Sequence, residues 1–318
     1  WIEVAGSHTS TRVLMTLMSR YSTLIDRIEA GEQVFIDGAT GTEIERRGVP
    51  QLDNAWNGGG ALSHPEILRA VHEDYIRAGA EIVISNTFAT LKSALRDAGL
   101  EEDFDAYNRR GVELACEARA ALGANTVVVA GGISHWSWSG NHPTLEELRD
   151  NATEQAAIMK EAGADLIMLE MMSKVEPMLA VLDGVQGCGL PVWVGLSCKL
   201  DSNGTPRLYD SDHTIGEQTL ADAIHALKGR NVPLISIMHT EVSYVDACLD
   251  VVEEMWVGPV GVYAHSGNYV GGKWIFNSVI SPADYATAAE GWRNRGVRVI
   301  GGCCGVGPTH IRALTAKK

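Results

Sequence analysis

Two adjacent cysteines near the C-terminus have the clearest chemical potential in this sequence. Cys303 and Cys304 lie in a Gly-Gly-Cys-Cys-Gly segment that directly follows an apolar run at residues 297–300. Adjacent cysteines rarely form a disulfide with each other, because one trans peptide holds their Cα atoms closer than an ordinary disulfide allows. Two interpretations remain: thiolate ligands for an ion such as zinc, or two small buried hydrophobic residues. The flanking glycines favour the metal site, because they let the backbone turn so that both sulfurs face one point.

The elements that must position these cysteines alternate regularly between strands and helices. Helix starts are indicated by Ser63 with Glu66, Thr144 with Glu147, and Ser281 before a proline. Strands that are apolar on both faces and alternate with helices are typical of a parallel sheet wrapped by helices. The sequence therefore predicts an α/β protein with a single (β/α)8 TIM barrel. Its eight strands are expected at residues 33–37, 81–86, 126–130, 165–170, 191–197, 234–237, 260–263 and 297–300.

A doubly wound open sheet is the alternative fold. Such a sheet usually has fewer strands, and no G-x-G-x-x-G fingerprint with a ribose-binding acid follows any predicted strand. Residues 15–318 contain no linker pattern and are expected to form the one barrel. Residues 1–14 are interpreted as a leader or an added arm, with Met15 or Met18 as the natural start, because they lack an initiator methionine and signal-peptide regions.

Composition restricts the classes of partner. The net charge is −14 and no basic run is present, which argues against nucleic acid or an anionic membrane surface as partner. No apolar stretch approaches the roughly 20 residues of a membrane span. Six irregularly spaced cysteines do not form a disulfide scaffold, so a reducing cytoplasm is the expected compartment. Small molecules are the expected partners, and a homo-oligomer remains open.

The predicted barrel brings several polar residues to one rim. Active sites of TIM barrels lie at the C-terminal ends of the strands. His239, at the end of the sixth predicted strand, is selected as the third metal ligand over Cys198 and His265, although a rim histidine held by hydrogen bonds is the alternative. The residues at these ends are Asp37 with Gly38, Asn86 with Thr87, Gly131 with Gly132, Glu170, Ser197 with Cys198, Met238 with His239, Ala264 with His265, and Cys303 with Cys304.

Asp37 and Glu170 are the two acids of this rim. A carboxylate at a strand end must be solvated, paired or bound to a cationic group. The pair would suit the α-ammonium of an amino acid whose far end reaches the metal, and the alternative is a pair of loop-anchoring carboxylates. Five aromatic residues in the loops could wall such a site and hold a methylated cation, or could simply pack there: Trp136, Trp138, Tyr209, Tyr269 and Trp274.

Several of these motifs resemble the homocysteine S-methyltransferase family. The matching segments occur in the family's order and are residues 37–42, 86–88, 163–170, and 301–305 with Pro308, His310 and Ile311. The resemblance implies a zinc-dependent barrel in which a thiol substrate binds the metal and accepts a methyl group. It implies that Cys303 and Cys304 are zinc ligands. It also places Asp37 and Glu170 in the amino-acid site, for which Gly38, Asn86 and Thr87 are further candidates. Zinc would deprotonate a thiol that is otherwise mostly protonated at neutral pH.

One departure from the family concerns the third ligand. Members usually carry a cysteine after the sixth strand, where this sequence reads Met238-His239-Thr240. A His-Cys-Cys set is less negative than three thiolates, so the bound substrate thiolate is expected to be less nucleophilic. The strand-seven segment also departs, with Ala264-His265 in place of the usual Pro-Asn.

The expected reaction is methyl transfer from an onium donor to homocysteine, giving methionine. A sulfonium resembling S-methylmethionine is favoured over betaine, because the chain lacks the long C-terminal extension of betaine-using relatives and has Leu91 near where they place a tyrosine. The alternatives are a family member with another acceptor or donor, including demethylation of an onium compound, and a non-catalytic barrel that binds an amino acid or onium ligand.

Overall fold

The computed structural model of this chain describes residues 19–209, 214–270 and 273–316. The predicted leader at residues 1–14 lies outside the described residues, as do Met15 and Met18.

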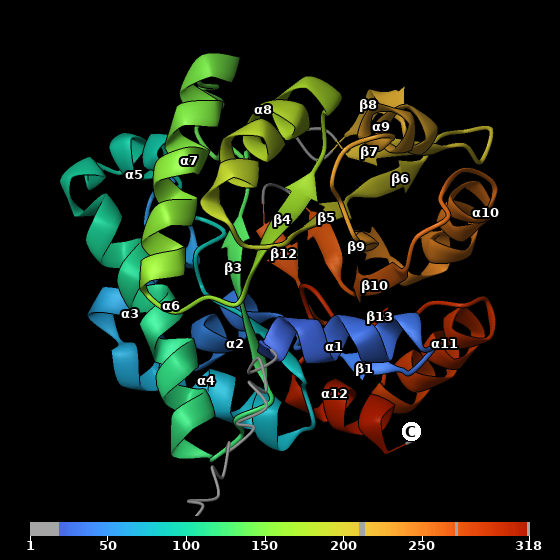
Figure 1. The fold of residues 1–318 in the computed structure, drawn as a ribbon, viewed down its shortest axis with the longest axis horizontal. Helices are drawn as coiled ribbons and strands as arrows, with labels where there is room; N and C mark the ends of the chain where they lie inside the picture. Colours follow the sequence, from blue (N-terminus) through green and yellow to red (C-terminus); the bar gives the residue numbers. More distant parts are fainter. Residues whose placement is uncertain (1–18, 210–213, 271–272, 317–318) are drawn as a thin grey trace, which may run out of the picture.

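Eight parallel strands form the centre of the molecule (Figure 1). They pair in the order β1-β13-β10-β9-β5-β4-β3-β2, and a parallel bridge between Ile36 and Ile82 joins the first strand to the second. The sheet therefore closes on itself, which confirms the predicted TIM barrel. Each of the eight predicted strands is present: β1 Val34–Phe35, β2 Ile82–Ile84, β3 Val128–Ile133, β4 Leu166–Met172, β5 Val192–Leu196, β9 Ile235–Glu241, β10 Val260–His265 and β13 Val299–Ile300.

Helices surround the barrel, and their starts test the predicted caps. α7 begins with the predicted capping box of Thr144 and Glu147, and the Ser281 side chain caps α11. The predicted cap at Ser63 is wrong. The helices are α2 Thr40–Arg46, α3 Gly60–Ser63, α4 Pro65–Arg77, α5 Lys92–Asp97, α6 Phe104–Ala121, α7 Leu145–Glu161, α8 Val175–Val185, α9 Leu220–Leu227, α10 Val245–Met255, α11 Pro282–Asn294 and α12 Pro308–Thr315, with single 3-10 turns at Asn57–Gly59, Glu101–Asp103, Gln186–Cys188 and Val242–Tyr244.

The error at Ser63 has a local cause. Ser63 is the last residue of α3, and its hydroxyl donates to the Gly59 carbonyl at 2.9 Å instead of capping the next helix. α4 starts one residue later than predicted, with His64 as N-cap and a proline at its first position. Because the proline ring fixes φ near the helical value and lacks an N–H that would need a cap, it suffices to start the helix.

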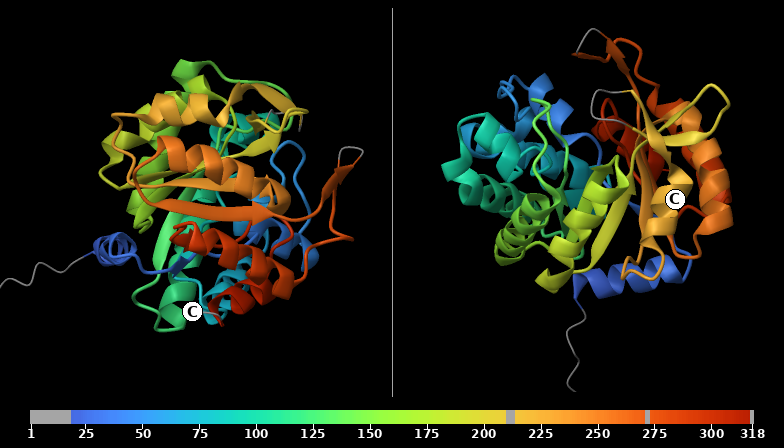
Figure 2. Two further views of the ribbon diagram at one scale, coloured as in Figure 1. Left: turned by 90° about the vertical axis from the view of Figure 1, so that its right-hand side faces the viewer. Right: turned by 90° about the horizontal axis from the view of Figure 1, so that it is seen from above.

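A further helix closes the N-terminal end of the barrel. α1 (Arg20–Glu29) packs Leu24 and Ile28 against the apolar side chains inside the barrel, and the indole of Trp193 donates to the Tyr21 hydroxyl at 3.1 Å. Figure 2 shows α1 at the end of the barrel opposite the β11–β12 hairpin. Among the described residues, this end is thus sealed by packing, and the pocket described below opens at the other end.

Two antiparallel additions stand at the C-terminal end and were missed by the sequence prediction. A three-stranded sheet follows β5 and consists of β6 Cys198–Leu200, β7 Pro206–Tyr209 and β8 Ile215–Thr219. A hairpin of β11 Asn268–Val270 and β12 Lys273–Ile275 follows β10. Both project beyond the same end of the barrel (Figure 2). Their strands are short and lie in connections between barrel strands, so no long apolar run marks them.

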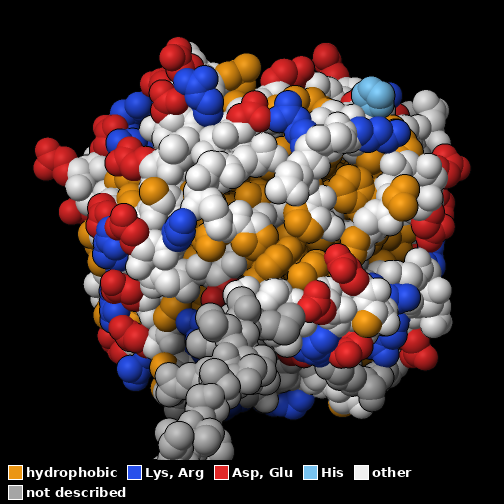
Figure 3. Space-filling view, in the orientation of Figure 1, with side chains coloured by type: hydrophobic (Ala, Val, Ile, Leu, Met, Phe, Trp, Pro, Cys, Tyr) orange, Lys and Arg blue, Asp and Glu red, His pale blue; other side chains and the backbone are white. Residues whose placement is uncertain are grey.

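The surface carries charges of both signs. In the view of Figure 3, acidic and basic side chains alternate around the periphery and apolar side chains occupy the middle of the face. Many of the arginines are paired with acids, as in the contacts of Arg295 with Asp250 at 2.6 Å and Glu253 at 2.8 Å. No helix among the described residues is long and apolar enough to cross a membrane.

Candidate metal centre and substrate pocket

A cavity of about 390 Å³ opens at the C-terminal end of the barrel. Its walls come from the ends of many barrel strands and from the segment between β1 and β2. They include the Gly38–Thr42 turn, Glu45, Trp56, Asn86, Phe88, Trp136, Trp138, Glu170, Met171, Met238, His239, Tyr263, Cys303 and Cys304.

The Gly-Gly-Cys-Cys-Gly turn is held at the floor of this pocket by close backbone packing. A Cβ on Gly301 would lie 2.1 Å from Cγ2 of Ile36 and 2.5 Å from the carbonyl oxygen of Asp37. Gly305 has φ of +82°, and a Cβ there would lie 2.0 Å from the Ser266 carbonyl oxygen. Only glycine fits both positions. The turn is thereby fixed against the ends of β1 and β10, with the Cys303 amide donating to the Ala264 carbonyl at 2.9 Å.

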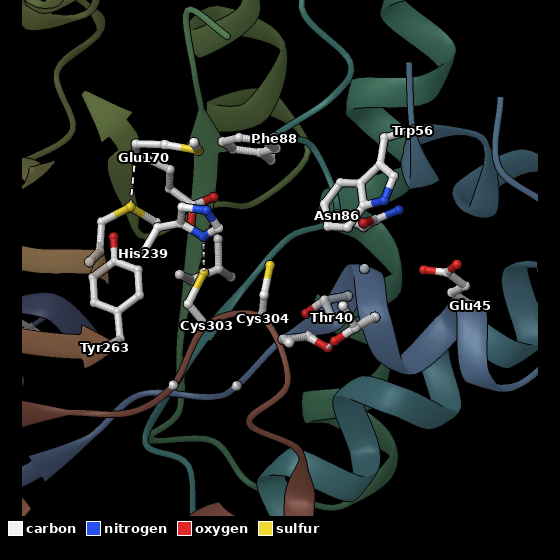
Figure 4. A pocket seen from close by; sticks show the side chains of 18 of the residues that line it. Thr40, Glu45, Trp56, Asn86, Phe88, Glu170, His239, Tyr263, Cys303 and Cys304 are labelled. Atoms are coloured by element: carbon white, nitrogen blue, oxygen red, sulfur yellow. Dashed lines mark hydrogen bonds between the residues drawn. The ribbon is translucent and has the colours of Figure 1, made fainter. Parts of the chain in front are cut away.

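His239 completes a group of three possible metal ligands (Figure 4). Its Nδ1 lies 3.3 Å from Sγ of Cys303. One ligand atom each from His239, Cys303 and Cys304 lie within 4.8 Å of one another. His239 has φ of +42°, a left-handed conformation that is uncommon outside glycine and often occurs at functional sites. The structure therefore gathers the three residues that the sequence nominated as ligands.

The Cys303 thiol of this group favours the protonated form. Hydrogen bonding to Cys304 and burial raise the pKa of the Cys303 thiol well above its ordinary value. Metal ligation requires thiolates, so binding of an ion here would be accompanied by proton release.

The two residues considered as alternatives to His239 do not belong to this group of possible ligands. Cys198 is buried beside Cys248, and neither residue lines the pocket. The ring of His265 lies 4.7 Å from that of His239, measured between centroids, but does not line the pocket.

Glu170 is the acid that faces the cavity. It is 8% exposed, and its carboxylate accepts no hydrogen bond and forms no ion pair among the described residues. Burial raises the pKa of this carboxyl to about 8. A Cβ on Gly132 would lie 2.5 Å from Oε2 of Glu170, so the glycine leaves the carboxylate its space. A buried acid that opens on a pocket without a partner is suited to a cationic ligand.

The other predicted substrate residues divide into pocket walls and supports. Gly38 and Asn86 line the cavity. Asp37 does not: its Oδ2 accepts a hydrogen bond from the Ile84 amide at 2.8 Å, which ties β1 to β2, and burial raises the pKa of its carboxyl. Thr87 is fully buried behind the wall, where its hydroxyl donates to the Gly132 carbonyl at 2.8 Å.

Only some of the predicted aromatic residues line the cavity. Trp136 and Trp138 line the cavity, whereas Tyr209 packs edge-on against His239 with ring centroids 5.6 Å apart. The side chains of Tyr269 and Trp274 lie outside what the structure describes.

Sequence reasoning did not nominate several residues of the pocket wall. Trp56, Phe88 and Tyr263 were missed, together with Glu45. Phe88 stands in a motif that was noted for its neighbours, and Tyr263 in a strand that was predicted as apolar. Trp56 and Glu45 lie outside any strand end, so the barrel argument could not select them.

Comparison with known proteins identifies the family. The model of the homocysteine S-methyltransferase family matches residues 34–317. A selenocysteine Se-methyltransferase of Brassica oleracea var. italica is 26% identical over 90% of this chain and 89% of that protein. The homocysteine S-methyltransferase of Escherichia coli strain K12 is 28% identical over 94% of this chain and 100% of that protein.

Solved structures agree with this assignment. The metallated form of the homocysteine methyltransferase MmuM from Escherichia coli has a TM-score of 0.75 and 26% identity, and covers 94% of this chain and 100% of that chain. An oxidised form of MmuM has a TM-score of 0.73 and 27% identity, and covers 90% of this chain and 96% of that chain. With its family model matched along nearly the whole barrel, this chain belongs to the homocysteine S-methyltransferase family.

Proposed function

We propose that this protein is a zinc-dependent S-methyltransferase that moves a methyl group from a sulfonium donor to the thiol of homocysteine, giving methionine. The observation that carries this proposal is the group of His239, Cys303 and Cys304 at the inner end of the pocket. The preferred donor resembles S-methylmethionine, and the catalytic unit is the barrel of residues 15–318, acting on small molecules in the cytoplasm.

The donor set of this group fits zinc. Two thiols and one imidazole form a nitrogen–sulfur set of the kind that zinc prefers among the common biological cations. Three protein ligands leave one position for a substrate atom, as in catalytic zinc sites. When bound, zinc would lower the pKa of a substrate thiol that coordinates it, so that the thiolate is available near neutral pH.

Glu170 is the residue proposed to hold the amino group of the acceptor. Its carboxylate lies near His239 at the inner end of the pocket (Figure 4) and has no protein partner among the described residues. An α-ammonium group would supply the missing positive charge and would favour the ionised carboxylate. Gly38 and Asn86 also line the pocket, while Asp37 and Thr87 act from behind by fixing the strand ends.

The remaining task of the protein is alignment. The acceptor sulfur forms a new bond to the methyl carbon as the bond from that carbon to the donor sulfonium breaks, and the thiol proton has by then been released. Such a displacement gains rate when both reactants are held in line. Trp136, Trp138 and Phe88 offer ring faces and edges beside the inner end, where a sulfonium can be held by cation–π attraction.

A single experiment tests this function. The purified protein is analysed for zinc under reducing conditions and then incubated with homocysteine labelled in its carbon chain and unlabelled S-methylmethionine. We expect about one zinc per chain and methionine that carries the label. Absence of both stoichiometric metal and labelled methionine would overturn the proposal. Methylation of another thiol, with no labelled methionine formed from homocysteine, would correct the acceptor.

A further inference from the structure

The outer end of the pocket has a composition of its own. Glu45, Trp56 and Asn86 line it, and Figure 4 shows them on the side of the cavity away from Cys303 and His239. The carboxylate of Glu45 is directed toward the cavity in this view. None of the groups proposed to hold the acceptor requires Glu45 or Trp56, so this end is available for a second ligand.

Trp56 is held in place by strain and by close packing. Its φ of +42° is rare for a large side chain and persists only where the surroundings enforce it. The indole lies directly over Gly41, where a Cβ would be 2.5 Å from Cη2 of the ring. It also packs edge-on against Phe88 with centroids 6.3 Å apart, and Phe88 packs in the same manner against Trp138 at 5.8 Å. The rings of Trp56, Phe88 and Trp138 therefore form a continuous line of edge-to-face contacts in the pocket wall.

The charges of the pocket select for cations. Among the described residues, the lining includes the carboxylates of Glu45 and Glu170 but no lysine or arginine. The carboxylate of Glu45 forms no ion pair or hydrogen bond with any described residue, whereas nearby Glu43 is paired with Arg46 and Arg47. Arg47 is also paired with Asp74 at 2.8 Å, so both arginines have acidic partners other than Glu45, and the charge of Glu45 remains for a ligand.

Asn86 adds a hydrogen-bond acceptor to this end. Its side-chain amide donates to the Asn57 carbonyl at 2.9 Å, and its Oδ1 accepts nothing from the described residues. A carboxylate, an amide oxygen and an indole face together complement a cation that carries N–H donors.

We propose that Glu45 binds the ammonium group of an amino-acid sulfonium donor and makes this group a determinant of donor specificity. The inference rests on the proposed function and extends it. Along the pocket, the possible metal ligands come first, then the rings of Phe88 and Trp56, then Glu45 (Figure 4). This order matches the acceptor sulfur, the sulfonium and the ammonium of two reactants aligned for transfer. An onium donor that has a carboxylate but no ammonium group would gain no binding affinity from Glu45.

The test compares two donors in the Glu45→Gln variant, which keeps the side-chain shape and removes the charge. The donors are S-methylmethionine and 3-(dimethylsulfonio)propanoate, which lacks the amino group. We expect the KM for S-methylmethionine to rise by roughly fivefold, as for the loss of an exposed ion pair, with kcat and the KM for homocysteine unchanged. The KM for the amino-free donor should change by less than about twofold, because Glu45 has no cation to bind there. Glu29→Gln, on α1 at the closed end of the barrel, controls for the change in net charge.

Equilibrium binding separates this inference from the proposed function. Calorimetric titration of S-methylmethionine into each variant needs no turnover, so it reports on Glu45 even if no methyl transfer to homocysteine is found. Weaker binding in Glu45→Gln than in Glu29→Gln supports the inference. Equal binding of S-methylmethionine by the wild type and Glu45→Gln, or an equal loss for both donors, would overturn it.

Discussion

The pocket rim and the packed layer between strands and helices contain the same kinds of side chain in different surroundings. Each has a pair of neighbouring cysteine thiols, Cys303 with Cys304 at the rim and Cys198 with Cys248 in the core. Each also has a buried ionisable group without a hydrogen-bond partner among the described residues, Glu170 at the rim and His72 in the core. None of the six cysteines, all of which are described, takes part in a disulfide.

What separates the two regions is access and a third donor. The rim pair has His239 within ligand distance and an open cavity in front of it. The core pair is surrounded by apolar side chains such as Leu208, and no third metal-ligand residue among the described residues completes a group there. Two close thiols therefore indicate a metal centre only where a further ligand and space for a substrate accompany them. Four predictions, each with its own variants, test this distinction.

Cysteine replacement should give the largest contrast. Cys304→Ser removes one of three proposed ligands, so we expect metal affinity to fall by at least about 100-fold and methyl transfer to be lost with it. Cys198→Ala removes a core thiol instead and should leave the bound metal unchanged while lowering the free energy of unfolding by about 1 kcal/mol. Metal content and urea denaturation measure the two effects. Full metal occupancy in Cys304→Ser would contradict the assignment of the rim pair.

Replacement of His239 tests the third ligand. His239→Ala should lower metal occupancy and activity together, because two thiolates alone hold zinc less well than three ligands. His239→Asn is the matched control for the backbone, since asparagine tolerates φ of +42° but is a poor zinc ligand. His239→Cys should keep the metal and, by making the ligand set more negative, should raise the activity with homocysteine. Retention of full metal in both His239→Ala and His239→Asn would show that the third ligand lies elsewhere.

The sequence predicted the barrel well because its signals are local and repeated. Eight apolar runs define eight strands, and the barrel topology alone brings their C-terminal ends together. That step placed His239 beside Cys303 although the two residues are 64 positions apart. The topology specifies which residues reach the rim, but it does not specify where each side chain points.

The parts that could not be predicted depend on side-chain direction and on irregular backbone. Asp37 was predicted at a strand end, as Glu170 was. In the structure, however, its Oδ2 accepts a hydrogen bond from the Ile84 amide, and the residue lies behind the pocket wall. Trp56 reaches the pocket because its backbone has a positive φ. Such a conformation is rare for tryptophan, so the sequence does not predict it. Packing over Gly41 makes that conformation possible, and such a contact is known only once both segments are folded.

Glu170→Gln should have an intermediate effect that depends on pH. The amide keeps the shape of the side chain but cannot bind an ammonium group as a charge, so we expect the KM for homocysteine to rise roughly 10- to 100-fold. Burial raises the pKa of Glu170 to about 8, so in the free wild-type protein the carboxylate forms only as the pH approaches and exceeds that value. The wild-type KM should therefore fall as the pH rises through this range.

Steady-state kinetics at several pH values measure this effect, and the ratio of variant to wild-type KM isolates the contribution of Glu170. That ratio should increase with pH, because only the wild type gains a charge. A ratio that is constant from about pH 6 to 9 would contradict the role of Glu170 as the ammonium partner, because its ionisation would then have no effect on binding.

His72 should give the smallest effect, on stability alone. Burial lowers the pKa of this histidine from 6.5 to about 4, so the folded protein keeps the ring neutral in a range where the unfolded chain protonates it. Below the pKa that His72 has in the unfolded chain, the unfolded state binds more protons than the folded state, and stability is lost as the pH falls from 6.5 toward 4.

His72→Leu removes this pH-dependent loss of stability and also removes two ring nitrogens that have no hydrogen-bond partner among the described residues. We expect a gain of about 1 kcal/mol in the free energy of unfolding at neutral pH and a larger gain at pH 5. Urea denaturation at both pH values measures the gain, with metal content and methyl transfer as controls that should not change. Loss of metal or activity in His72→Leu would show that His72 in the core affects the site as Glu170 at the rim does. The distinction between the two regions would then be wrong.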